Sequence, residues 1–264
     1  KHVVSEFQKR GVVFIEDFDE IRDTSRPVIL SAHGTEQRVL TDGAKRNLKL
    51  IDATCPLVKR VHRQIQKLEN AGAHIIVIGK ESHPEIIGTI GQIEHHGQIT
   101  VISSEQDAEA LSLPTDKPIG VVTQTTLSVD KAQRIIAILQ QKFPDLITAD
   151  KNDICYATTH RQAAVREVSK HCEALIVIGS KNSSNSKQLQ QTALHNGIEK
   201  SWLIDDVSEL AADALTGIEN LGISAGASAP EHLVNNLIAK LKEDFANLKI
   251  HDIIVAEENI EFKS

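Results

Sequence analysis

Cys55 and Cys155 are the residues of this chain whose type and position best suit metal or redox chemistry. Each cysteine precedes apolar residues that recur every three or four positions, which predicts a helix beginning at the cysteine. The positive end of a helix dipole favours a thiolate over a thiol. A third equivalent cysteine would place three thiolates around one axis, enough to hold an iron–sulfur cluster with one iron open to a ligand. Two buried, inert cysteines are the alternative interpretation.

The chain contains a repeat with an offset of about 100 residues. Gly79 and Gly179 each follow one of these cysteines by 24 residues, and each ends an apolar run typical of a buried strand. Residues 121–126 and 223–228 match in the same way, as a short strand, a loop of small residues and the start of a helix. The common offset indicates duplicated α/β units. Cys172 lies outside the repeat and is interpreted as a bystander.

Polar side chains gather where the predicted strands end, which is where ligands bind in open α/β sheets. They are His33, His83 with Glu85, Gln124 with Thr125 and Thr126, Ser183 with Ser184 and Asn185, and Ser228. Hydroxyl, amide and imidazole donors at helix starts favour an anion such as phosphate, because the helix dipole acts with them. Taken singly, the serine tract could be a helix cap and each histidine a structural residue. Their convergence favours a phosphate site.

Glu85 follows His83 by two residues on the same predicted loop. A carboxyl group that faces a dry, anionic ligand has a raised pKa, which suits a proton donor. A solvated loop glutamate is the alternative that the sequence leaves open.

Composition restricts the class of protein. The 264 residues are 41% hydrophobic and 25% charged, with a formal net charge of −7 and no basic run, which argues against a nucleic-acid or anionic-membrane partner. No apolar run approaches the roughly 20 residues that span a bilayer. Three widely spaced cysteines do not form a disulfide framework, so we expect a reducing, cytoplasmic compartment.

Alternating strands and helices predict an α/β fold with mostly parallel sheets. We expect α/β units at residues 1–54, 55–152 and 153–245, and a tail at 246–264 that packs back on the first unit. The first unit has no cysteine-headed helix, and the chain has no methionine, so we expect a fragment whose third cysteine lies upstream of Lys1.

Some local patterns give more detailed expectations. Residues 12–15, 250–255 and 260–262 are predicted to be strands from their apolar and β-branched side chains. The segment Ser228-Ala229-Pro230-Glu231 is predicted to be a capping box with proline inside the first helical turn.

Together these motifs resemble the LytB/IspH family of 4-hydroxy-3-methylbut-2-enyl diphosphate reductases, over nearly the whole chain. The matching segments are residues 31–34, Asp52 to Val58, His83-Pro84-Glu85, Thr123 to Asp130, Asp153 to Thr159, Gly179 to Ser186 and Ala225 to Pro230. The resemblance implies a trefoil of three α/β units around a central [4Fe-4S] cluster. It implies reductive removal of the substrate hydroxyl to give isopentenyl and dimethylallyl diphosphates, the last step of the non-mevalonate isoprenoid pathway.

The resemblance also implies a role for each matching residue. Cys55 and Cys155 become cluster ligands, and Glu85 becomes the proton donor. The substrate-binding residues become His33, His83, Thr125, Ser183, Ser184, Asn185 and Ser228. A flavodoxin or ferredoxin becomes the electron donor. The family's leading segment, with its first cluster cysteine and a further histidine, has no counterpart in this sequence.

Two hypotheses compete with a reductase. A redox-inert diphosphate-binding protein would use the serine, asparagine and histidine loops alone. A zinc-dependent hydrolase is disfavoured, because the candidate residues contain no close ligand pair such as Cys-x-x-Cys or His-x-x-x-His.

Overall fold

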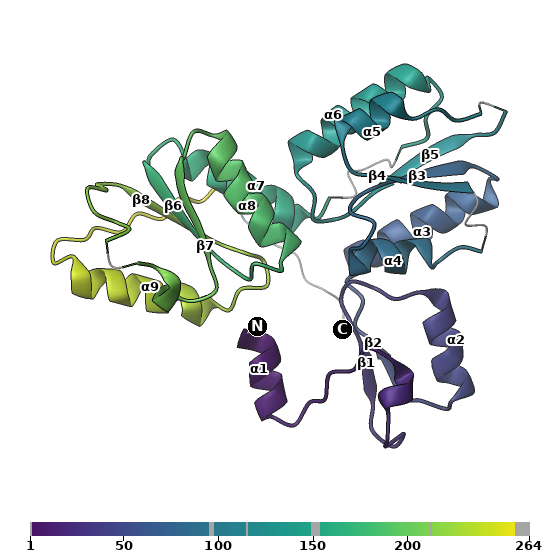
Figure 1. Ribbon diagram of the computed structural model, residues 1–264, viewed down its shortest axis with the longest axis horizontal. Coiled ribbons are helices and arrows are strands. Elements are labelled where there is room, and N and C mark those ends of the chain that lie inside the picture. Colours follow the sequence, from purple (N-terminus) through teal and green to yellow (C-terminus); the bar gives the residue numbers. More distant parts are fainter. Residues whose placement is uncertain (1, 95–97, 115, 149–153, 212, 257–264) are drawn as a thin grey trace. The chain divides into compact units, whose positions relative to one another are not determined.

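The computed structural model describes residues 2–94, 98–114, 116–148, 154–211 and 213–256 (Figure 1). The chain forms two compact units, one of Val13–Cys155 and one of Lys1–Val12 with Tyr156–Ser264. Every strand pair between the named strands of the described residues is parallel, which confirms the predicted α/β class.

The Val13–Cys155 unit contains two parallel sheets. The smaller sheet pairs β1 (Val28–Leu30) with β2 (Leu50–Asp52), and α2 (Gln37–Lys45) connects them; a short 3-10 helix, η1 (Phe18–Glu20), precedes β1. In the larger sheet, β3 (His74–Ile78) lies between β4 (Ile99–Ile102) and β5 (Ile119–Thr123). Its helices are α3 (Pro56–Asn70), α4 (Pro84–Ile90), α5 (Glu105–Ala110) and α6 (Val129–Lys142).

Both faces of the larger sheet are covered, which is why β3 reads as a continuous apolar run. Alternate β3 side chains belong to two cores. Ile75 and Val77 pack in a cluster with α3 and α4, whereas Ile76 and Ile78 pack in a cluster with α5 and α6.

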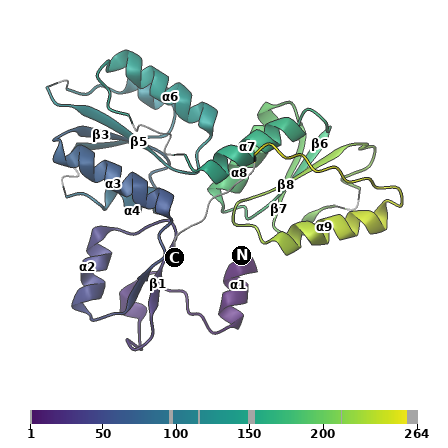
Figure 2. The ribbon, with the colours of Figure 1, turned by 180° about the vertical axis from the view of Figure 1, so that it is seen from behind.

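The second unit repeats this plan, as Figure 2 shows from behind. Here β6 (Ala174–Ile178) lies between β7 (Lys200–Ile204) and β8 (Leu221–Ala225). Leu175 and Val177 pack with α7 (Tyr156–Val168) and α8 (Ser184–His195), and Ile176 and Ile178 pack with α9 (Glu231–Asp244). The unit also includes α1 (His2–Lys9) and the 3-10 helix η3 (Val207–Glu209).

The predicted repeat extends to individual backbone hydrogen bonds at the carboxyl ends of the sheets. Gly79 N–H donates to the Ile102 carbonyl and Gly179 N–H to the Ile204 carbonyl, both at 2.9 Å. Gln124 N–H donates to Ile78, and Gly226 N–H donates to Ile178, both at 2.8 Å. The two turns that follow β3 and β6 therefore have the same backbone connections. The predicted boundaries at residues 54, 152 and 245 stay a prediction.

Three local predictions are wrong. Residues 12–15 and 250–255 are not strands, because none of them pairs with another strand among the described residues, and residues 260–262 lie outside that part of the chain. The capping box is also absent, since α9 begins at Glu231 with Pro230 as its N-cap and no side-chain cap. Ser228 lies before the helix, in a turn that closes when Ala229 N–H donates to the Gly226 carbonyl.

Across the described ranges, no helix combines the length and the apolar character needed to cross a bilayer.

Candidate functional site

Glu85 is a buried acid in the first turn of α4, with 2% of its surface exposed. Its Oε1 accepts a hydrogen bond from Thr125 N–H at 2.6 Å, and its Oε2 accepts one from the Thr125 hydroxyl at 3.0 Å. Burial raises the pKa of the Glu85 carboxyl, and the two bonds from Thr125 oppose this rise. The burial rules out a solvated loop glutamate and fits a proton donor.

His83 caps the N-terminus of α4 and lies beside His33. Its Nδ1 accepts a hydrogen bond from Glu85 N–H at 3.2 Å, so the neutral ring carries its proton on Nε2. The His33 and His83 rings meet edge to face, with 5.6 Å between centroids and 87° between planes. Desolvation lowers the pKa of both imidazoles, and His33 and Lys80 lower the pKa of His83 further. The lowered pKa values favour the neutral form of both rings.

Cys55 and Cys155 occupy the same kind of position, as the repeat predicts. Cys55 is the N-cap of α3, and Cys155 directly precedes α7. Cys55 N–H donates to Ala32, two residues beyond β1, at 3.1 Å. Cys155 N–H donates to Thr125, two residues beyond β5, at 2.9 Å. Both are partly buried thiols rather than halves of a disulfide.

A continuous series of contacts connects the two cysteines within the Val13–Cys155 unit. The backbone N–H of Cys55 is hydrogen-bonded to the carbonyl of Ala32, and Ala32 is adjacent in sequence to His33. The His33 ring contacts His83, and His83 is bonded to Glu85. The Glu85 carboxyl accepts a hydrogen bond from Thr125 N–H, and the Thr125 carbonyl accepts one from Cys155 N–H. One series of contacts therefore links six of the predicted site residues: His33, Cys55, His83, Glu85, Thr125 and Cys155.

The other predicted residues lie at the carboxyl end of the sheet in the second unit. Ser183 caps α8, accepting from Ser186 N–H at 3.2 Å, and Ser184 is the first residue of that helix. Asn185 is 6% exposed, yet neither atom of its side-chain amide has a hydrogen-bond partner among the described residues. Ser228 is exposed in the turn between β8 and α9.

The side-chain amide of Asn185 is a buried polar group whose hydrogen-bonding atoms have no partner among the described residues. A buried polar group without a partner costs on the order of 1–3 kcal/mol. A phosphate that accepts from its Nδ2 would recover part of that cost, and the start of α8 favours negative charge at the same place.

The donor set of the first unit suits iron bound by sulfur. Thiolates are the soft ligands that iron–sulfur clusters use, and both cysteines stand at helix starts. Within the described residues, no group of three or more His, Cys, Asp and Glu side chains could hold a metal ion. The role of Cys55 and Cys155 as cluster ligands therefore stays a prediction.

Ser186 and Arg161 help to shape the second site, and sequence reasoning missed both. The Ser186 hydroxyl is buried so close to Gly179 and Gly226 that a Cβ at either glycine would lie 2.2 Å from it. Arg161 of α7 donates from Nη1 to the carbonyl of Ala225, the last residue of β8, at 3.0 Å. The repeat could have indicated Ser186, because it takes the place of the core residue Ile86. An arginine on a helix surface gives no comparable signal.

Comparison with known proteins gives a consistent result. The family model described as "LytB protein" matches residues 1–242. A 4-hydroxy-3-methylbut-2-enyl diphosphate reductase from Histophilus somni is 44% identical over 264 residues, covering 100% of this chain and 83% of that protein. One from Rhizobium etli is 43% identical over 262 residues, covering 98% and 78%. The solved E-1-hydroxy-2-methyl-but-2-enyl-4-diphosphate reductase from Plasmodium falciparum matches with a TM-score of 0.95 and 32% identity, covering 100% and 82%.

Proposed function

The chain belongs to the LytB protein family, and from this premise we propose that it acts as a 4-hydroxy-3-methylbut-2-enyl diphosphate reductase. The reaction breaks the bond between carbon and the hydroxyl oxygen of the substrate. It consumes two electrons and two protons, releases one water and leaves isopentenyl or dimethylallyl diphosphate. It is the last step of the non-mevalonate pathway to isoprenoids.

The contact series from Cys55 to Cys155 carries this proposal. This series links a buried, protonatable carboxyl to two cysteines at helix starts and to two imidazoles, which supports the proposal. The imidazoles would serve as donors to an anionic substrate, and the carboxyl would serve as its source of a proton.

In the proposed mechanism, Glu85 protonates the departing hydroxyl oxygen. Its buried carboxyl keeps a proton at higher pH than an exposed one, and Thr125 fixes its orientation through two hydrogen bonds. The loss of the hydroxyl as water then needs no proton from solvent at that oxygen.

The diphosphate binds to donors from both units in this proposal. His33 and His83 donate from the first unit, and Ser183, Ser184, Asn185 and Ser228 donate from the second. Neutral donors are suited to an anion that must be released as product, since they hold charge less tightly than lysine or arginine.

Cys55 and Cys155 would hold the [4Fe-4S] cluster as two of its thiolate ligands. When bound, the cluster supplies the two electrons and an open iron for the substrate oxygen. We propose a flavodoxin or a ferredoxin as the electron donor, and a reducing cytoplasm as the compartment because both thiols must stay reduced.

Replacing the cysteines one at a time tests this function. The substitutions are made in the protein as it is expressed naturally, and the cluster is reconstituted without oxygen. Cys55→Ser and Cys155→Ser should each lower the amount of bound iron and abolish reduction of the diphosphate substrate. Cys172→Ser is the matched control, because Cys172 lies outside the contact series, and it should keep both properties. A wild-type protein with no iron absorbance and unchanged diphosphate affinity in all three variants would favour the redox-inert binding protein instead.

A further inference from the structure

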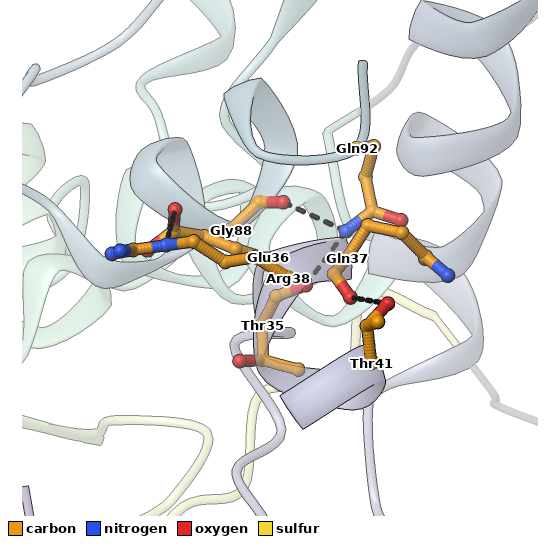
Figure 3. Close-up of polar contacts among 7 residues, drawn as sticks. All are labelled: Thr35, Glu36, Gln37, Arg38, Thr41, Gly88 and Gln92. Carbon is orange, nitrogen blue, oxygen red and sulfur yellow. Dashed lines mark hydrogen bonds and ion pairs between the residues drawn. The ribbon is translucent and has the colours of Figure 1, made fainter. Parts of the chain in front are cut away.

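Gln92 connects the loop that carries His33 to the far end of α4. Its Nε2 donates to the Thr35 carbonyl at 2.6 Å and to the Gly88 carbonyl at 3.0 Å (Figure 3). One acceptor belongs to the loop after β1 and the other to the helix, so a single amide group joins the two elements.

The loop and the helix are in close contact around this amide. A Cβ at Gly88 would lie 3.0 Å from the carbonyl carbon of Gly34, and a Cβ at Gly91 would lie 2.3 Å from Glu36 Cγ. Gln37 N–H also donates to the Gly91 carbonyl at 2.8 Å. The glycines let the two backbones approach, and Gln92 is the side chain that fixes this approach.

The opposite end of α4 carries the other half of the site. His83 caps its first turn and Glu85 follows two residues later, whereas Gly91 and Gln92 follow its last turn at Ile90. The loop therefore contacts α4 at both ends, through the His33–His83 ring contact and through Gln92.

We propose that Gln92 is a positioning residue for His33, holding the loop on α4 so that the His33 ring stays edge-on to His83. This inference rests on the proposed function, because it assumes that His33 contributes to diphosphate binding. Gln92 itself touches no substrate in the proposal and acts only through the loop.

A double-mutant cycle with inorganic pyrophosphate as the probe tests the inference. Gln92→Leu keeps the size of the side chain and removes both donor hydrogens. By calorimetry on the whole chain, we expect its dissociation constant for pyrophosphate to rise about tenfold, the effect of one or two lost hydrogen bonds. In a His33→Ala background, the same substitution should have no further effect, because its target is gone.

Gln66→Leu is the matched control, since Gln66 and Gln92 line the same cavity of about 240 Å³. It should leave the dissociation constant unchanged. If Gln92→Leu lowers the melting temperature of the protein, Gln92→Met is used in its place, because methionine also has no side-chain hydrogen-bond donor. Histidine ring nitrogen resonances give an independent measurement, and those of His33 should shift in either variant while those of His232 on α9 stay in place.

The possible outcomes separate the two claims. If His33→Ala weakens binding but neither Gln92 variant does, the positioning role is wrong and the proposed function stands. Additive losses in the double mutant would also overturn the positioning role. If His33→Ala leaves binding unchanged, the assigned role of His33 fails and the inference about Gln92 falls with it.

Discussion

The turns after β3 and after β6 share a backbone and differ in almost every side chain that could do chemistry. His83 N–H donates to Lys80, and Ser183 N–H donates to Ser180, each at 2.8 Å. On this common frame, the first turn carries Glu85, whose carboxylate is bonded to Thr125. The second carries Asn185 at the equivalent position, with its amide unsatisfied.

This difference shows how a duplicated unit can divide a task. The first turn has an internal partner for its acid, so its carboxyl is fixed in place before any ligand binds. The second turn keeps polar atoms without a partner in the described residues, so its hydrogen bonds are available to a ligand. In the proposed function one unit supplies the proton and the other supplies much of the anion site, and the two turns differ at the position held by Glu85 and Asn185.

The largest expected effect comes from removing the acid. Glu85→Gln keeps the shape of the side chain but cannot transfer a proton in the same way, so we expect turnover to fall about a hundredfold to ten-thousandfold. The Michaelis constant should change little, since the carboxyl is proposed to act on the leaving oxygen. Steady-state reduction assays on the reconstituted protein measure both quantities.

Glu81→Gln is the control, because Glu81 is an exposed acid four residues earlier on the same turn. Normal turnover in Glu85→Gln would show that Glu85 is not the proton donor.

A second test compares His62 of α3 with Gln162 of α7, which are buried at equivalent positions. Burial lowers the pKa of His62 to about 4, below its ordinary value of about 6.5. Between these values the unfolded chain binds more protons, so the free energy of unfolding should decrease as the pH falls from 6.5 toward 4. The contribution is about 2 kcal/mol at most once solvent screening is allowed for.

His62→Gln gives α3 the residue of its counterpart and should remove this part of the acid sensitivity. Urea unfolding at pH 7 and pH 4.5 measures the change. Identical pH dependence in the variant and the wild type would mean that His62 is not the group responsible.

A third test adds a side chain at Gly226, the position that corresponds to Gln124 in the first unit. A Cβ at Gly226 would lie 2.2 Å from the Ser186 hydroxyl, so Gly226→Ala should destabilise the fold by about 1.5 kcal/mol. Adding Ser186→Ala removes that oxygen and should restore most of the loss, since the Ser186 Cβ would be 3.4 Å away. Thermal unfolding of the single and double variants decides, and no recovery in the double variant would contradict the packing argument.

The smallest expected effect is on affinity alone. Asn185→Ala removes an amide that has no hydrogen-bond partner in the described residues, so the melting temperature should stay the same or rise. Pyrophosphate affinity should fall about tenfold, equivalent to one charge-assisted hydrogen bond. A loss of stability without a loss of affinity would show that the amide serves the fold and not a ligand.

Sequence reasoning predicted the parts of this protein that depend on local pattern. The apolar runs of β3 and β6 and the glycines that follow them were enough to identify the repeated units, because fully buried parallel strands have few alternatives. Residues 12–15 have a similar composition but lack a partner strand in the described chain, and composition cannot supply a partner.

The sequence could select the candidate site residues, which stay a prediction, but it could not give their contacts. Glu85 and Thr125 are separated by 40 positions, and their two hydrogen bonds depend on β3 and β5 being neighbours. The contact of Gln92 with Thr35 spans 57 positions and follows from the close approach of glycines on both elements. Such pairings come from tertiary structure, which a single sequence does not display.

The cap on α4 makes the protonation of His83 a structural event. The lone pair on Nδ1 is already engaged by the first turn of the helix, so a second proton can enter the ring only by displacing that turn's own N–H. Acid would then do more than add a charge to one imidazole. It would also remove the side-chain cap of the first turn of α4, the turn that carries Glu85.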